Sequence, residues 1–109
     1  MTEYMPPYLT SESAIQAEIV KRLRASGWLV IVTSQDRRTR KQLKDIPDLI
    51  CFRRGMTLLV ECKTPTGKMK PGQIDFMSDL TEHIGPNLAY QVMMYPEDVD
   101  PWCRATGPA

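Results

Sequence analysis

Three charged side chains stand at the ends of two short apolar runs. Asp48 opens the run 49–52, and Glu61 and Lys63 close the run that begins at residue 57. Alternate residues of a strand point to opposite faces, so Glu61 and Lys63 share one face. If the two runs pair as a hairpin, Asp48 lies beside both of them. The spacing therefore predicts that two carboxylates and an amine converge at one strand end.

Two carboxylates that lie close together repel at neutral pH unless something offsets their charge. Mg²⁺ does so in many proteins, taking one or two carboxylates together with waters and phosphate oxygens. The backbone carbonyl of Cys62 offers a further oxygen, and Lys63 has the reach to hold a water or a phosphate. This set suits metal-assisted hydrolysis of a phosphodiester. The alternative is a salt bridge between Lys63 and one carboxylate at a solvated strand edge.

Two other polar residues are candidates for the same site. Glu18 lies on the apolar side of the first expected helix, directly before Ile19. A glutamate there is costly to bury without a partner, so it either joins the site as a metal ligand or reaches solvent at the edge of the stripe. Gln73 stands at the start of the second expected helix. It is placed to hydrogen-bond a phosphate or Lys63, or it is an ordinary first-turn residue.

The elements that must position these residues follow from periodicity and caps. The first helix begins at a capping box of Ser13 and Gln16, or at the rival cap Ser11, and ends at Gly27. The second helix runs from Pro71 to about residue 83. Strands are expected over residues 28–32, 49–52, 57–63 and 88–95. The order α-β-β-β-α-β predicts an α/β fold with a mixed sheet flanked by helices.

The length of 109 residues predicts one domain, and Pro6 and Pro7 favour an extended lead-in at 1–10. The net charge of +1 gives no argument for a nucleic-acid partner, which only a local cluster of cations supports. Such a cluster precedes Asp48, and two more lysines follow Lys63. The expected DNA-binding residues are Arg37, Arg38, Arg40, Lys41, Lys44, Lys68 and Lys70. The alternative is a solvated basic loop.

The three cysteines fit neither a zinc spacing nor a disulfide framework, which favours a reducing, intracellular setting. The first residues lack the pattern of a signal peptide, and no apolar run reaches membrane-spanning length. We therefore expect a cytoplasmic protein that is not attached to a membrane.

The chain resembles the VRR-NUC branch of the PD-(D/E)xK nuclease superfamily. The matching segments are "QAEIVKRL" around Glu18, "IPDLI" at 46–50, "LLVECKTPTGKMKPGQIDF" at 58–76 and the strand near 90–95. The resemblance covers roughly residues 11–98, and it implies these bounds for the domain, with a tail at 99–109. It implies a restriction-endonuclease-like core and cleavage of DNA that depends on Mg²⁺ or Mn²⁺. One departure is Asp45, which stands where the family pattern suggests a glycine before Ile-Pro-Asp.

The resemblance also implies roles for individual residues. Lys63 would position the attacking water, and Gln73 would brace the site. The implied metal ligands are Asp48, Glu61, Glu18 and the Cys62 backbone carbonyl. Small standalone members look like virus-type Holliday junction resolvases, which implies a phage or prophage protein acting in the host cytoplasm.

The hypothesis is a metal-dependent endodeoxyribonuclease that acts on branched DNA. Symmetric cutting of a four-way junction needs two sites related by a two-fold axis, and one chain has one site, so a homodimer is expected. A flap, nick or duplex nuclease is the near alternative. A module that binds nucleic acid without cutting it is the alternative from another class.

Overall fold

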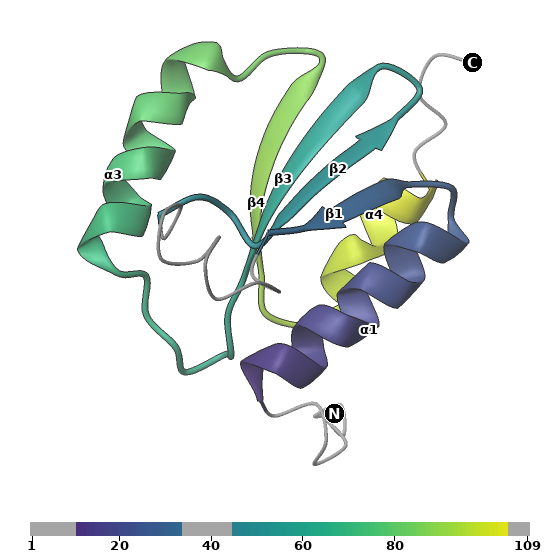
Figure 1. The fold of residues 1–109 in the computed structure, drawn as a ribbon, viewed down its shortest axis with the longest axis horizontal. Coiled ribbons are helices and arrows are strands. Elements are labelled where there is room, and N and C mark those ends of the chain that lie inside the picture. The colour runs from purple at the N-terminus through teal and green to yellow at the C-terminus, as the bar shows by residue number, and fades with distance from the viewer. Residues whose placement is uncertain (1–10, 34–44, 105–109) are drawn as a thin grey trace.

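Four strands form one mixed sheet in the computed structural model, which describes residues 11–33 and 45–104 (Figure 1). The elements in chain order are α1 (Glu12–Ala25), β1 (Leu29–Val32), β2 (Leu49–Arg53), β3 (Met56–Cys62), α3 (Pro71–Leu80), η2 (Thr81–His83), β4 (Leu88–Met93), η3 (Pro96–Val99) and α4 (Asp100–Arg104). The α/β class and the order α-β-β-β-α-β expected from the sequence are confirmed. The short helix η3 and then helix α4 follow β4.

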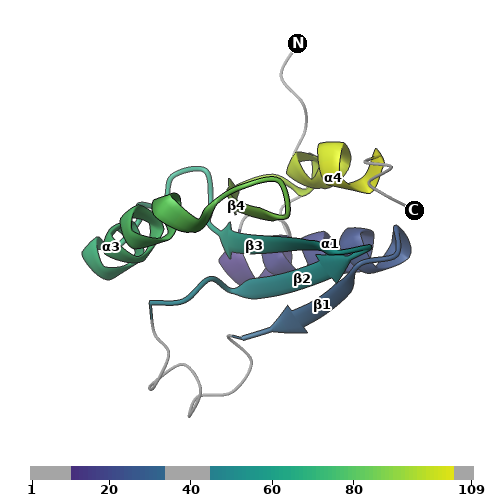
Figure 2. The ribbon, with the colours of Figure 1, turned by 90° about the horizontal axis from the view of Figure 1, so that it is seen from above.

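The sheet has the strand order β1-β2-β3-β4. Strands β1, β2 and β3 pair antiparallel and lie side by side in Figure 2, whereas β4 pairs parallel to β3. Arg54 and Gly55 form the two-residue turn between β2 and β3, with φ of 49° and 82°. Positive φ at both positions suits the right-handed twist of a tight hairpin. The expected hairpin is therefore confirmed, and it brings the start of β2 to the end of β3.

Helix α1 covers one face of the sheet with a stripe of buried aliphatic side chains, Ile15, Ile19 and Leu23. The helix begins two residues earlier than the capping box at Ser13 predicts. Ser11 is the N-cap, and its Oγ accepts a hydrogen bond from the Ala14 N–H at 3.2 Å. Ser13 lies inside the helix, so the rival cap is the correct one. The consequence is that Glu12 occupies the first turn of α1.

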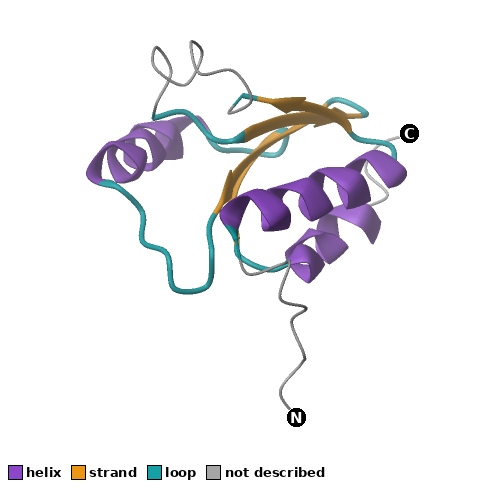
Figure 3. Ribbon diagram, turned by 60° about the horizontal axis from the view of Figure 1, so that its bottom comes forward, coloured by secondary structure: helices purple, strands orange, loops and turns teal. Residues whose placement is uncertain are grey.

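The C-terminal helix α4 packs on the same side of the sheet as α1, and α3 lies across the sheet from both (Figures 1 and 3). The Trp28 indole N–H donates to the Trp102 carbonyl at 3.1 Å, and Val99 is fully buried. These contacts join the chain segment after β4 to the core. In the described part of the chain, no helix is long and apolar enough to cross a membrane.

Candidate active site

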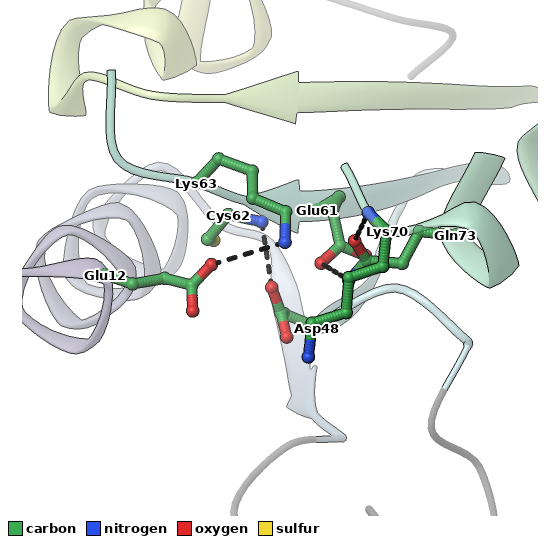
Figure 4. A network of polar contacts seen from close by, with 7 residues as sticks. All are labelled: Glu12, Asp48, Glu61, Cys62, Lys63, Lys70 and Gln73. Carbon is green, nitrogen blue, oxygen red and sulfur yellow. Dashed lines mark hydrogen bonds and ion pairs between the residues drawn. The ribbon is translucent and has the colours of Figure 1, made fainter. Parts of the chain in front are cut away.

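The charged side chains singled out in the sequence meet at the end of the β2–β3 hairpin (Figure 4). Asp48 directly precedes β2, Glu61 and Cys62 end β3, and Lys63 follows. The Asp48 Oδ2 accepts a hydrogen bond from the Cys62 N–H at 2.9 Å. Because β2 begins only at Leu49, the Asp48 side chain takes the place of a strand partner for this N–H. The hydrogen bond fixes the carboxylate of Asp48 next to that of Glu61.

Glu61 is buried, with 2% of its surface exposed, and it is held by α3. The Gln73 Nε2 donates to the Glu61 Oε1 at 2.9 Å, and the Gln73 Oε1 accepts from the Lys70 backbone N–H at 2.9 Å. Pro71 at the first position suits the start of α3 and places Gln73 in its first turn. The side-chain partner of Gln73 is therefore Glu61, where the sequence suggested Lys63 or a phosphate.

The electrostatics of the pair are dominated by burial. Removal from water raises the pKa of Glu61 from 4.5 to about 8, and the charge of Asp48 and a hydrogen bond with it act in the same direction. Lys63 opposes the rise. Without a bound cation, the Glu61 carboxyl thus holds a proton at neutral pH. The site has more negative charge than the surrounding protein compensates.

Lys63 is buried and forms an ion pair with α1. Its Nζ lies 3.7 Å from the Glu12 Oε1. Glu18 is instead paired with Arg22 at 3.2 Å, one turn further along the same helix. Glu12 is the acidic residue that the sequence reasoning missed. The sequence does contain a signal for Glu12. It lies three residues before Ile15, on the same side of the helix as the apolar stripe, whereas the resemblance pointed to Glu18.

The donor set fits a hard divalent cation. Asp48 and Glu61 supply two carboxylates, the number that Mg²⁺ typically takes from protein. The N–H and C=O of one strand residue point toward the same neighbouring strand, so the Cys62 carbonyl lies on the Asp48 side of β3. The Cys62 thiol is buried in the core, and its pKa is raised mainly by burial, so it is no thiolate ligand. Within 11–33 and 45–104, no three His, Cys, Asp or Glu side chains form a cage.

The expected DNA-binding residues divide into two groups. Lys68 and Lys70 are exposed in the segment between β3 and α3, close in sequence to Lys63. The other five, Arg37, Arg38, Arg40, Lys41 and Lys44, lie outside the described residues. Asp45 lies within the described residues. Its carboxylate packs so closely on Gly72 that a Cβ added to Gly72 would clash with it. Asp45 therefore contacts the first turn of α3.

An α/β sheet that gathers two carboxylates and a lysine at one strand end has the arrangement of a phosphodiesterase of the nuclease class. The family model for the VRR-NUC domain matches residues 5–94. The chain therefore belongs to the VRR-NUC family, a family of nucleases, and the resemblance seen in the sequence is confirmed.

A solved structure described as "VRR_NUC domain" is similar to this chain over 87% of its length and 96% of the other chain. The two share 26% sequence identity, and the TM-score is 0.62. A comparison with curated proteins found no match.

Proposed function

We propose that this VRR-NUC domain hydrolyses phosphodiester bonds of DNA with Mg²⁺ or Mn²⁺. The observation that carries the proposal is the pair of adjacent carboxylates at the hairpin end, where Glu61 is 2% exposed with a raised pKa and Asp48 is half-buried. Asp48, Glu61 and the Cys62 carbonyl would hold the ion. When bound, a divalent metal lowers the pKa of a coordinated water and offsets the charge that develops on the phosphate.

Other residues of the chain would act around the metal. Lys63 would orient the attacking water or steady a phosphate oxygen, and its ion pair with Glu12 limits where the ammonium can lie. Gln73 would hold the Glu61 carboxylate in one orientation through its hydrogen bond. Lys68 and Lys70 would neutralise DNA phosphates beside the site. Glu18 would reach the site only by giving up its pair with Arg22.

For the substrate we propose branched DNA, cut by a homodimer. The family resemblance and the need for two sites at a four-way junction support this choice. Three exposed apolar side chains on paired strands also support a dimer, because they offer a surface for a second copy to cover. They are Leu29, Ile31 and Phe52, which are 63%, 47% and 41% exposed. We place the enzyme in the cytoplasm, where the free thiols of Cys51, Cys62 and Cys103 would stay reduced.

The alternative of a module that only binds DNA is less favoured. Binding requires cations at the surface, whereas burying Glu61 beside the half-buried carboxylate of Asp48 costs free energy without aiding DNA contact. A metal ion held by the two carboxylates would offset this free energy, so metal-assisted hydrolysis explains the pair better than DNA binding does.

The test is cleavage of a labelled four-way junction, a flap and a linear duplex in Mg²⁺, Mn²⁺ or EDTA. Glu61→Gln is the variant expected to lose activity, and Glu82→Gln, at an exposed glutamate of η2, is its matched control. Metal-dependent paired incisions in the junction support the full proposal. Cutting of flaps or duplex instead retains the nuclease and changes its substrate. No cutting of any DNA by a folded wild-type protein would contradict the proposal.

A second pair of variants tests which acid of α1 serves the site. Glu12→Gln is expected to slow cleavage because it breaks the ion pair with Lys63. Glu18→Gln breaks only the pair with Arg22 and is expected to cut at the wild-type rate. The reverse result would restore Glu18 as the relevant residue.

A further inference from the structure

Tyr90 of β4 lies on the same face of the sheet as Glu61. The parallel register pairs Leu59 with Tyr90 and Glu61 with Val92, so Tyr90 of β4 is the diagonal neighbour of Glu61 on the adjacent strand β3. Diagonal neighbours on one face are within reach of an aromatic side chain. Tyr90 is half-buried, and it stands on the face opposite to the core that α1 covers. The strand register alone therefore brings a phenol to the neighbourhood of the carboxylate pair.

The hydroxyl of Tyr90 has no partner in the part of the chain that the structure describes. No hydrogen bond of this hydroxyl is found there. Every fully buried side-chain nitrogen or oxygen in that part has a partner, so an unpartnered Tyr90 hydroxyl there is not fully enclosed. Burial of the ring and the charges of Glu61 and Asp48 raise the pKa of Tyr90 to about 12. Both carboxylates thus disfavour the ionised phenolate, so the phenol keeps its proton.

The other donors of the site each have one acceptor already, while the Lys63 ammonium and the Gln73 amide keep further N–H groups. The Cys62 N–H donates to Asp48, the Gln73 amide donates to Glu61, and the Lys63 ammonium is paired with Glu12. A phosphodiester brought to the carboxylate pair has two non-bridging oxygens. One of them would face a cation held by the carboxylates, and the other would accept a hydrogen bond from donors of the protein. A protonated phenol is such a donor, and it is a poor ligand for a cation.

We propose that Tyr90 contacts the DNA and donates its hydroxyl hydrogen to a non-bridging oxygen of the phosphodiester bound at the Asp48–Glu61 site. The inference rests on the proposed nuclease function and adds a substrate-contacting residue from β4. Tyr90 thereby orients the phosphate from the side of the sheet that faces α3, and Lys63 acts beside Asp48.

The experiment compares wild type, Tyr90→Phe and the control Tyr95→Phe. Tyr95 is an exposed tyrosine at the cap of η3. Phenylalanine keeps the ring of Tyr90 and removes only the donor. Four quantities are measured: kcat/KM with Mg²⁺, DNA affinity in Ca²⁺, Mn²⁺ affinity without DNA, and Tm. A hydrogen bond to a charged group predicts a loss of roughly 10-fold or more in kcat/KM for Tyr90→Phe. DNA affinity is expected to fall with it, while Mn²⁺ affinity, Tm and the Tyr95→Phe control are unchanged.

Two results would overturn the inference while the nuclease proposal stands. One is an active wild type with an equally active Tyr90→Phe variant. The other is a loss of cleavage in Tyr90→Phe that comes with a lower Tm or weaker Mn²⁺ binding, since this would make the hydroxyl a structural or metal-site group. A wild-type protein that cuts no DNA in either metal would instead overturn the nuclease proposal, and the Tyr90 contact with it.

Discussion

Replacement of Glu61 by glutamine is expected to stabilise the metal-free protein at alkaline pH. Glutamine has nearly the same shape and carries no charge. Its oxygen keeps the hydrogen bond that the Gln73 amide donates at 2.9 Å, and its amide can donate to Asp48. The substitution thus replaces the repulsion between the buried carboxylate of Glu61 and the half-buried one of Asp48 by a hydrogen bond. Stability and catalysis are expected to change in opposite directions, as they often do at strained functional sites.

The magnitude follows from the pKa of Glu61, which is raised from 4.5 to about 8 in the folded protein. A carboxyl with a raised folded pKa favours the folded state fully below pH 4.5, and this contribution is lost as the pH rises through about 8. At 1.36 kcal/mol per pKa unit, the ceiling is about 5 kcal/mol. The site can relax and water can enter it, so we expect about 1–3 kcal/mol.

The assay is thermal unfolding of wild type, Glu61→Gln and the exposed control Glu82→Gln in EDTA from pH 5 to pH 9. Wild type and Glu61→Gln should have similar Tm at pH 5, and the variant should be higher by roughly 5 °C or more at pH 9. Saturating Mn²⁺ should raise the Tm of wild type and leave Glu61→Gln unchanged. A variant with a Tm at or below that of wild type at pH 9, while folded by circular dichroism, would refute the reasoning.

Three further outcomes are expected. Glu12→Gln should change the free energy of unfolding by less than about 1 kcal/mol, because its ion pair with Lys63 involves a half-exposed carboxylate. Denaturant titration measures this change, and a larger loss would show that Glu12 has a structural role. Gly72→Ala should change the free energy of unfolding by less than about 1 kcal/mol, because its Cβ meets the end of the Asp45 side chain, which can turn aside, and alanine suits a helix better than glycine. A loss of about 3 kcal/mol that Asp45→Gly restores in a double-mutant cycle would show instead that the Asp45 carboxylate is held in place. Mn²⁺ affinity should rise up to about 10-fold per pH unit from pH 6 to pH 8, since the metal must displace the Glu61 proton; calorimetry that finds no pH dependence would contradict the raised pKa.

Local sequence patterns were sufficient for most of the fold. The alternation and β-branching of the apolar runs predict the strands, and the turn residues Arg54 and Gly55 set the hairpin register that brings Asp48 to the end of β3. Parallel pairing of β4 with β3 was not predicted, because it joins segments separated by the whole of α3. The sequence does not choose between Ser11 and Ser13 as the N-cap of α1, because both serines satisfy the same local rule.

The approach of Asp48 to Glu61 and Cys62 was thus determined by the sequence itself, because a two-residue turn fixes which residues of a hairpin lie opposite each other. Contacts between separate elements were decided only by the tertiary structure. The choice of Glu12 over Glu18 as the partner of Lys63 depends on where the N-terminus of α1 meets the sheet. The Gln73–Glu61 hydrogen bond depends likewise on how α3 docks. Such contacts depend on the packing of whole helices, which residue types and local spacing do not specify.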